Sequence, residues 1–550
     1  MRGLQLLLVA TILGSSNAIN NGYGLLPPMG WRSWNCYHAD VNQTLMESIM
    51  DRMAERVHKV DDKPTSLADL GYLAVGLDDN WQKCGAGVDG SFHDKDGNPI
   101  INTDTFPDMK KMTDHAHSLG LRAGWYMNNC ICSEHEFKDP AAIAAHMQRS
   151  AQAVADFGFD GVKLDGCGEF RNLTWWAQLL NATGRPIMIE NCHWGGTVPG
   201  QTTGDAPCDG TETPSDCPYN FFRTSGDITN TWGSMFKNLQ TTTAYQGEPP
   251  LARPGTWAYP DMLEVGRMAS YEEDRTHFAA WAITSSPLIL GYDLNDDNIT
   301  SRVWDIIANV ETLQISQTWA GHPGRLAKQW QPSSPTPPGN STRYLWGVSC
   351  DKTSPEQVGW KLNTDSQLTI DNLCVAPAQS SDSLLLDLVA CDATDKAQKF
   401  TFDGSIKHTE TGKCVDVYDF KGPVVQLYAC NGGKNQAFKL DGTMVTAASG
   451  QCVADKAGPP SEDTGDVMQL WTKPLANGEV AALILNAYST DSFVSNIDLT
   501  DLGFASGTTV AVRDVYGHKD LGTAQGKFTT DSVGPHDSRL YRFTPKTVLA

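Results

Sequence analysis

The sequence has few basic residues for its length, and it lacks a long hydrophobic run beyond its first 18 residues. Its 550 residues include 42 Lys and Arg against 64 Asp and Glu, which gives a formal net charge of −22 at pH 7. A chain this acidic is repelled by nucleic acid and by anionic membranes, so we expect neither as a partner. No later stretch reaches the roughly 18 apolar residues of a transmembrane helix. We therefore expect a soluble mature protein.

The first 18 residues have the pattern of a secretory signal peptide. Arg2 precedes an apolar run from Leu4 to Leu13, and Ser16-Asn17-Ala18 offers small residues for cleavage. We expect residues 1–18 to be removed and the protein to be secreted, or delivered to a lysosome or vacuole. Asn-x-Ser/Thr sequons for glycosylation fit such a compartment, and they occur at Asn42, Asn172, Asn181, Asn298 and Asn340.

Signatures of metal and nucleotide binding are also missing. The 14 cysteines contain no Cys-x2-Cys pair matched by a second pair, so disulfides are favoured over zinc. No Gly-x-Gly-x-x-Gly follows a strand-like segment. His115 and His117 lie on a polar helical segment and are expected to be solvated. We therefore expect neither a metal nor a cofactor.

Strand-like and helix-like segments alternate from the mature start to about residue 315. Helical patterns cover 46–60, 109–119 and 141–157. The alternation predicts a (β/α)8 barrel, and two doubly wound domains are the alternative. Eight segments are predicted as strands: 28–31, 72–77, 121–126, 162–164, 186–190, 221–223, 253–259 and 287–290.

Polar and aromatic side chains gather at the carboxyl ends of these strands, where such a barrel places its active site. Asp165 ends one strand, although an isolated Leu-Asp-Gly is more often a helix cap. Carboxylates and aromatic rings without a phosphate cradle are typical of a site for a neutral sugar, and two carboxylates suffice for glycoside hydrolysis. The set is Trp34, Asp78, Asp79, Trp81, Tyr126, Lys163, Asp165, Arg223, Asp227 and Asp261.

Five motifs occur in order along the chain: Pro28-Met29-Gly30-Trp31 with Trp34, Leu77-Asp78-Asp79, Lys163-Leu164-Asp165-Gly166-Cys167, Arg223 followed by Asp227, and Pro260-Asp261-Met262-Leu263. Together they resemble glycoside hydrolase family 27, which contains α-galactosidases and α-N-acetylgalactosaminidases. The resemblance runs from about residue 24 to 320 and resumes near the C-terminus.

The resemblance implies a retaining double displacement, with Asp165 as nucleophile and Asp227 as general acid/base. Their carboxyl groups should then lie about 5–5.5 Å apart. Asp165 must stay ionised, which neighbouring Lys163 favours, whereas Asp227 must hold a proton, so we expect an acidic pH optimum. Asp78 and Asp79 would hold the O4 and O6 hydroxyls of galactose. The resemblance implies that the sugar contacts Trp34, Asp78, Asp79, Tyr126, Lys163, Cys167, His193, Arg223 and Asp261.

The chain departs from the family after the fifth strand. α-Galactosidases of the family usually read Cys-Glu-Trp, where this chain has Cys192-His193-Trp194. A histidine can donate to a 2-hydroxyl, and the small Ser/Ala pair of an N-acetyl pocket is not evident. We therefore expect an exo-α-galactosidase. The alternatives are a β-L-arabinopyranosidase, an α-N-acetylgalactosaminidase or a non-catalytic carbohydrate-binding protein.

The resemblance also suggests disulfides in the barrel. Cys36 would pair with Cys84, and Cys192 with Cys217. Cys167 would pair with either Cys130 or Cys132, which leaves the other for Cys208.

A threefold repeat follows the Pro-rich linker 331–340. Cys350, Cys391 and Cys430 recur at intervals of 41 and 39 residues, and a second cysteine series recurs at 40 and 38. Three such units suit a closed module and resemble a ricin-type β-trefoil lectin, here over 341–465. The expected bonds are Cys374–Cys391, Cys414–Cys430 and, by threefold closure, Cys350–Cys452.

Only the middle unit of the repeat keeps the lectin's sugar-binding pattern. It has Asp416, Tyr428 and the amide pair Asn435-Gln436, whereas the other units have alanine at the Asp416 position. We expect at most one glycan site, with a spacer module as the alternative.

The remaining segments, 321–340 and 466–550, resemble the antiparallel β-domain that follows the family's barrel. We therefore expect an α/β chain: a (β/α)8 barrel over 19–320 and a C-terminal β-sandwich that carries the inserted trefoil. A galactose-containing carbohydrate is the expected substrate, and a homodimer is an option that the sequence leaves open.

Overall fold

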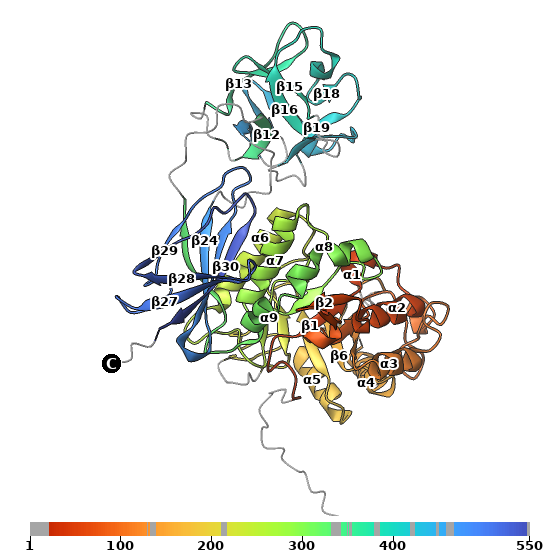
Figure 1. Cartoon of the computed structure of the whole chain (residues 1–550). Helices are drawn as coiled ribbons and strands as arrows, with labels where there is room; N and C mark the ends of the chain where they lie inside the picture. Colours follow the sequence, from red (N-terminus) through yellow and green to blue (C-terminus); the bar gives the residue numbers. More distant parts are fainter. Residues whose placement is uncertain are drawn as a thin grey trace, which may run out of the picture.

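A computed structural model places most of the chain, as three bodies of secondary structure (Figure 1). The predicted signal peptide and most of the predicted linker lie outside the described residues. The structure describes residues 21–128, 130–132, 139–210, 217–331, 343–348, 350, 355–378, 385–417, 424–446, 450–457 and 467–546.

The first body is a (β/α)8 barrel, as predicted. Eight parallel strands pair in the order β10-β1-β4-β5-β6-β7-β8-β9, and a parallel bridge between Leu263 and Leu290 joins the two ends of the sheet. The strands are β1 (Met29–Arg32), β4 (Ala74–Gly76), β5 (Arg122–Met127), β6 (Gly161–Asp165), β7 (Met188–Cys192), β8 (Phe221–Arg223), β9 (Trp257–Tyr259) and β10 (Leu288–Leu290).

Helices cover the outside of the barrel. From α2 onward, each begins after a residue whose side chain accepts a hydrogen bond from a backbone N–H of the first turn. Such caps satisfy N–H groups that have no partner within the helix. The helices are α1 (Trp34–Tyr37), α2 (Gln43–Ala54), α3 (Met109–Ser118), α4 (Pro140–Asp156), α5 (Leu173–Ala182), α6 (Trp232–Thr241), α7 (Tyr271–Ile283), α8 (Asp297–Ile307) and α9 (Val310–Gln317).

The helix predicted over 46–60 is wrong in its second half. Helix α2 ends at Ala54, and β2 (His58–Val60) pairs with β3 (Lys63–Thr65). Asp61 and Asp62 connect the two strands with φ values of 48° and 63°. Positive φ at both central residues gives a two-residue turn whose twist matches a hairpin, and aspartate tolerates that conformation.

The C-terminal β-domain packs one face of its sheet on the barrel. Along β25, Ala481, Leu483 and Leu485 join the barrel core, whereas Ala482 and Ile484 join a separate core on the other face. This alternation follows from the period of two in a strand. The sheet order is β11-β24-β25-β30-β27-β28-β29-β26. The strands are β11 (Arg325–Trp330), β24 (Met468–Pro474), β25 (Val480–Asn486), β26 (Asn496–Asp498), β27 (Thr509–Asp514), β28 (Lys519–Gln525), β29 (Lys527–Thr529) and β30 (Ser538–Pro545).

The trefoil is inserted into this sheet, as predicted. Strand β11 precedes the trefoil and pairs in antiparallel fashion with β24, which follows it, so that Trp330 lies opposite Met468. The first strand of the β-domain is thus separated from the others in sequence but not in space.

The trefoil has its own hydrophobic core. Trp360, Phe400 and Phe438, which follow the repeated cysteines, are buried in it at equivalent places. Its ends pair with each other through β12 and β23. The strands are β12 (Arg343–Val348), β13 (Val358–Leu362), β14 (Leu368–Ile370), β15 (Leu373–Pro377), β16 (Leu386–Ala390), β17 (Phe400–Phe402), β18 (Ile406–His408), β19 (Cys414–Val417), β20 (Val425–Tyr428), β21 (Phe438–Leu440), β22 (Gly442–Thr446) and β23 (Cys452–Ala457).

The trefoil contains the three disulfides that the repeat predicted: Cys350–Cys452, Cys374–Cys391 and Cys414–Cys430.

Two disulfides predicted in the barrel are wrong. Cys84 bonds Cys132 and not Cys36, and Cys217 bonds Cys208 and not Cys192. Cys36 and Cys192 are free thiols. Cys192 ends β7 with its sulfur 3.4 Å from Nη1 of Arg223, so it faces the buried charges of the barrel and away from the loop cysteines.

Cys167 bonds Cys130, one of its two expected partners. Cys208 was expected to bond the other member of that pair, Cys132, and this expectation is also wrong. Among the described residues, no helix has the length and apolar character needed to cross a membrane.

Candidate active site

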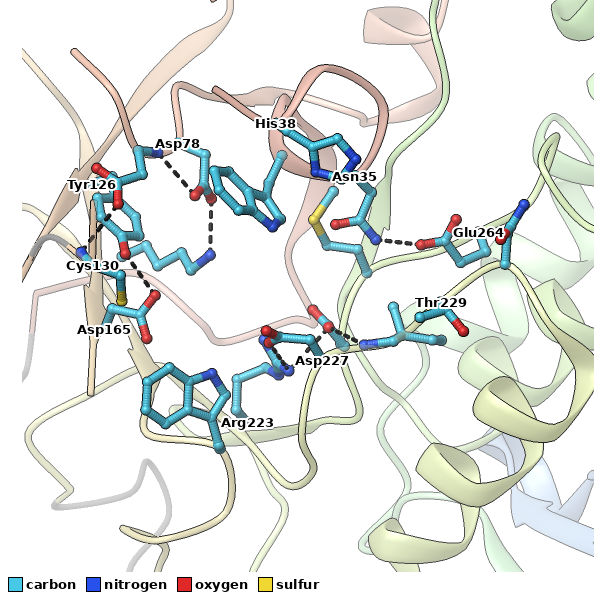
Figure 2. Close-up of a pocket in the computed structure, with 18 of the residues that line it drawn as sticks. Asn35, His38, Asp78, Tyr126, Cys130, Asp165, Arg223, Asp227, Thr229 and Glu264 are labelled. Carbon is cyan, nitrogen blue, oxygen red and sulfur yellow. Dashed lines mark hydrogen bonds and ion pairs between the residues drawn. The ribbon is translucent and has the colours of Figure 1, made fainter. Parts of the chain in front are cut away.

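A cavity of about 340 Å³ opens at the carboxyl ends of the barrel strands (Figure 2). Most of the residues predicted from the strand ends meet there. The lining comprises Trp34, Asn35, His38, Asp78, Asp79, Tyr126, Cys130, Lys163, Asp165, Trp194, Arg223, Asp227, Ile228, Thr229, Asn230, Asp261, Met262, Glu264 and Arg267.

Asp165 is the last residue of β6 and only 6% exposed. The Tyr126 hydroxyl donates to its Oδ2 at 2.7 Å, and the Gly166 amide donates to its Oδ1 at 2.8 Å. Burial raises the pKa of Asp165, while Lys163 and these two hydrogen bonds act in the opposite direction. The carboxylate is thus held in a fixed orientation with little water around it.

Lys163 contacts Asp78 directly. Its Nζ lies 2.9 Å from Asp78 Oδ2 and 5.1 Å from the centre of the Tyr126 ring. Burial alone would lower the pKa of Lys163, but the attraction of Asp78 raises it above its ordinary value. The expected influence of Lys163 on Asp165 therefore acts through space, without a direct bond between them.

Asp79 lines the cavity and also holds the loop after β5. Its Oδ2 accepts from the amides of Cys130 and Ile131 at 3.1 and 2.9 Å, and its Oδ1 accepts from Gln82 at 2.6 Å. The first two bonds fix the loop that carries Cys130 against the cavity.

Asp227 lies on the cavity rim. Its side chain is 66% exposed, and Nη2 of Arg223 lies 2.9 Å from its Oδ1. The same nitrogen is 3.0 Å from Oδ2 of Asp261, which also accepts from the Ile228 amide at 2.8 Å. Arg223 and Asp261 therefore position the loop that carries Asp227. Figure 2 shows Asp165, at the end of β6, and Asp227, in the loop after β8, projecting toward the same space.

His193 is not among the residues that line the cavity. Its ring faces Thr197, with Nδ1 3.0 Å from the hydroxyl oxygen, and burial lowers its pKa to about 4. Trp194 lines the cavity instead, 40% exposed and with a φ of 47°. A Cβ at Gly166 would lie 2.8 Å from the Trp194 ring, so glycine after Asp165 permits this close packing.

Several lining residues were not predicted. Glu264 is buried, accepts from Asn35 and pairs with Arg267, and burial raises its pKa to about 7. His38 and Thr229 also line the cavity. Glu264 directly follows the motif that contains Asp261, and this position is the sequence feature that indicates a place near the cavity. His38 follows the four-residue helix α1 and belongs to none of the sequence motifs.

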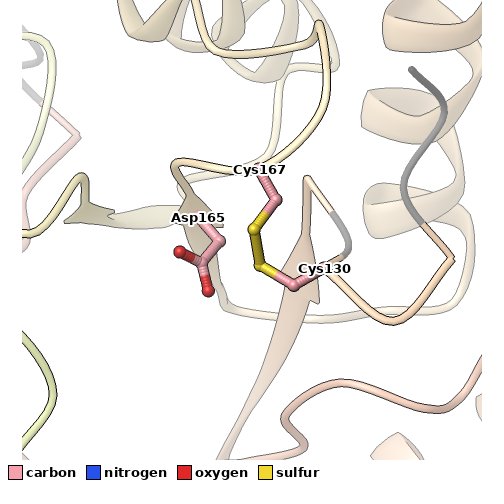
Figure 3. A group of neighbouring side chains, drawn as sticks. All are labelled: Cys130, Asp165 and Cys167. Atoms are coloured by element: carbon pink, nitrogen blue, oxygen red, sulfur yellow. A yellow bond between two sulfur atoms is a disulfide. The ribbon is translucent and has the colours of Figure 1, made fainter. Parts of the chain in front are cut away.

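Cys130, Asp165 and Cys167 bring two sulfurs and a carboxylate close together (Figure 3). The two sulfurs are bonded to each other, so neither is a thiolate that could ligate a metal. The disulfide connects the ends of β5 and β6 beside Asp165. Cys130 lines the cavity, whereas Cys167, which the resemblance placed against the sugar, is not among the lining residues.

Residues 26–318, more than half of the chain, match the family model described as alpha galactosidase A. The chain belongs to this family, glycoside hydrolase family 27. Residues 465–543 match the alpha galactosidase C-terminal beta sandwich domain, and residues 336–438 match the ricin-type beta-trefoil lectin domain.

Individual relatives of this family 27 chain include an α-galactosidase from Cyamopsis tetragonoloba, 31% identical over 56% of this chain and 68% of the relative. The fold is similar to that of an α-galactosidase from Mortierella vinacea, with a TM-score of 0.56, 20% identity and coverage of 95% and 98% of the two chains. The fold is also similar to that of a β-L-arabinopyranosidase from Geobacillus stearothermophilus, with a TM-score of 0.58, 16% identity and coverage of 96% and 99%.

The family 27 chain also has a second polar cluster, in the middle unit of its trefoil. Oδ2 of Asp416 accepts from the amides of Asn435 and Gln436 at 2.8 and 2.9 Å. Tyr428 lies on the neighbouring strand with 48% of its surface exposed. The four residues predicted for the lectin site therefore combine a fixed carboxylate with an exposed ring.

Proposed function

We propose that this protein is a retaining exo-α-galactosidase that removes terminal α-D-galactosyl residues from oligosaccharides or glycoconjugates. One observation carries the proposal: two carboxylates, Asp165 at the end of β6 and Asp227 in the loop after β8, line one cavity. Asp165 is buried and hydrogen-bonded, whereas Asp227 is on the rim. Retaining glycosidases place two carboxyl groups beside the scissile bond, one as nucleophile and the other as acid and then base.

In the first step, the Asp165 carboxylate attacks the anomeric carbon, and the bond to the leaving oxygen breaks. Asp227 gives its proton to that oxygen, and a glycosyl ester forms at Asp165. In the second step, Asp227 takes a proton from water, the water oxygen attacks the anomeric carbon, and the Asp165 carboxylate leaves. Two inversions retain the configuration of the sugar.

Trp194 supports the choice of a sugar with a free 2-hydroxyl. Its indole closes the wall next to Gly166, the residue that follows the nucleophile. A large ring there leaves less room for a 2-N-acetyl group than for a hydroxyl. In this proposal Trp194 fulfils the role that the sequence suggested for His193.

The test compares nitrophenyl glycosides of α-galactose, α-N-acetylgalactosamine and β-L-arabinopyranose. We expect the α-galactoside to be hydrolysed best. Asp165→Ala should abolish turnover, and azide should restore part of it by replacing the carboxylate as nucleophile. Full activity of Asp165→Ala would disprove the assignment, and no turnover of any glycoside by the wild type would favour a non-catalytic carbohydrate-binding protein.

We further propose that the trefoil binds one galactose-type glycan through Asp416, Tyr428, Asn435 and Gln436. Fixed acceptors and amides suit sugar hydroxyls, and an exposed ring suits the apolar face of the sugar. Weak binding there would raise the effective concentration of a glycan near the cavity. Tyr428→Ala should abolish retention on galactose-coated resin while hydrolysis of nitrophenyl galactoside stays unchanged. Equal retention of both proteins would refute the site.

The six disulfides support an oxidising destination for the protein, by secretion or in a lysosome or vacuole.

A further inference from the structure

A buried ion pair lies beneath the cavity and has no part in the steps described above. Arg32 ends β1, and Glu190 is the third residue of β7. Three strands separate β1 from β7 in the sheet order, so the pair spans the barrel interior. Arg32 is 8% exposed and Glu190 is 2% exposed. Nη2 of Arg32 contacts Oε2 of Glu190 directly.

The pair continues to the residues of the cavity. Nη1 of Arg32 lies 3.5 Å from Oδ2 of Asp78, the same oxygen that contacts Lys163 at 2.9 Å. The other oxygen of Asp78, Oδ1, accepts from the Asp79 amide at 2.9 Å. Asp78 is thus held between two cations, and Glu190 holds one of them. Lys163 in turn lies two residues before Asp165 on β6.

Such a pair is not explained by stability alone. Removing two charges from water costs several kcal/mol per ion, and apolar residues of similar volume often stabilise a protein as well or better. Breaking the pair on one side, however, leaves an uncompensated buried charge. A buried pair next to substrate-binding groups therefore points to a functional role.

We infer that Arg32 and Glu190 are positioning residues for the catalytic cavity. Glu190 fixes Arg32, and Arg32 together with Lys163 fixes the Asp78 carboxylate against the sugar hydroxyls. The pair also keeps the charge beneath Asp165 balanced. This inference rests on the proposed hydrolysis of a galactoside, with Asp78 as a sugar-binding residue.

The pair acts within a dense set of charges, all of which face the barrel interior. Removing Glu190 adds one positive charge to this set, and removing Arg32 adds one negative charge. The titratable neighbours are Asp78 after β4, Tyr126 on β5, Lys163 and Asp165 on β6, Cys192 on β7, Arg223 on β8 and Tyr259 on β9.

The experiment measures kcat and KM for nitrophenyl α-galactoside against pH in Arg32→Met, Glu190→Gln and the double variant. Arg32→Met should lower kcat/KM about ten- to a hundredfold, mainly by raising KM, because Asp78 loses a charged partner. The acidic limb of the kcat/KM profile should move to higher pH in Arg32→Met and to lower pH in Glu190→Gln. In the double variant the limb should return towards that of the wild type.

Arg302→Met is the matched control, because Arg302 contacts another buried carboxylate, Asp274, at 2.6 Å outside the cavity. It should leave the pH profile unchanged. If Arg32→Met fails to fold, Glu190→Gln and the double variant still decide the question, because the double variant buries no unpaired charge. Acidic limbs that stay fixed, or that move in the same direction in both single variants, would overturn the inference. An inactive wild type would instead refute the proposed function.

Discussion

Replacing Tyr126 by phenylalanine removes one hydrogen bond to Asp165 and little else. The hydroxyl donates to Asp165 Oδ2 at 2.7 Å, and the ring that remains keeps its contact with the Lys163 ammonium. A hydrogen bond to a charged group contributes about 1.5–3 kcal/mol. Since 1.36 kcal/mol corresponds to one pKa unit, its loss should raise the pKa of Asp165 by about 1–2 units.

The sign follows from which form the hydroxyl stabilises. It stabilises the carboxylate, so its removal favours the protonated acid, which cannot attack the sugar. The acidic limb of kcat/KM should therefore move to higher pH by about 1–2 units, while the alkaline limb stays in place. The assay is kcat/KM for nitrophenyl α-galactoside from about pH 3 to about pH 8, because this quantity reports ionisations of the free enzyme.

The matched control for this prediction is Tyr271→Phe. It removes a hydroxyl–carboxylate hydrogen bond of 2.6 Å to Asp305, on a helix outside the cavity. This variant should leave the acidic and alkaline limbs of the kcat/KM profile at their wild-type pH values. If Tyr126→Phe loses activity uniformly across pH with an unshifted acidic limb, the hydroxyl does not control ionisation of Asp165, and the reasoning fails.

Two further predictions concern the loop disulfides and the rim carboxylate. Removal of the Cys130–Cys167 bond, whose cysteines are 37 residues apart, should cost about 4 kcal/mol of unfolding free energy in denaturant titrations, and removal of Cys208–Cys217, with a separation of 9, should cost less. The reverse order would show that chain entropy does not dominate. Asp227→Ala should lower kcat/KM for a galactosyl oligosaccharide by about 10²–10⁴-fold but lower kcat/KM for nitrophenyl galactoside far less, because kcat/KM reports the first step and nitrophenolate leaves without a proton. Equal losses for both substrates would argue against a proton-donor role.

The barrel and most of the residues that line its cavity could be predicted because both depend on local patterns. A strand that ends at Asp165, or just before Asp78, places that residue at the carboxyl end of a parallel barrel, where active sites lie. The trefoil disulfides were predictable for a related reason, since threefold repetition fixes which cysteines meet.

Features that depend on contacts between distant segments could not be predicted. Whether Cys84 bonds Cys36 or Cys132 depends on loop paths that no periodicity records. Which of His193 and Trp194 lines the cavity depends on the left-handed backbone of Trp194, whose φ is 47°. The Arg32–Glu190 pair joins two strands on opposite sides of the barrel, and neither residue stands out in its own segment.

The pairing of β11 with β24 has a consequence for how the protein is assembled. In the β-domain, the whole trefoil stands where an ordinary hairpin would have a turn, because Trp330 and Met468 face each other across the sheet. The ends of the trefoil are also neighbours, paired through β12 and β23. A module with adjacent ends can enter or leave a hairpin without disturbing the strands on either side. The trefoil is therefore an insertion at the position of a turn, and the pairing of β11 with β24 lies outside the trefoil's own strands.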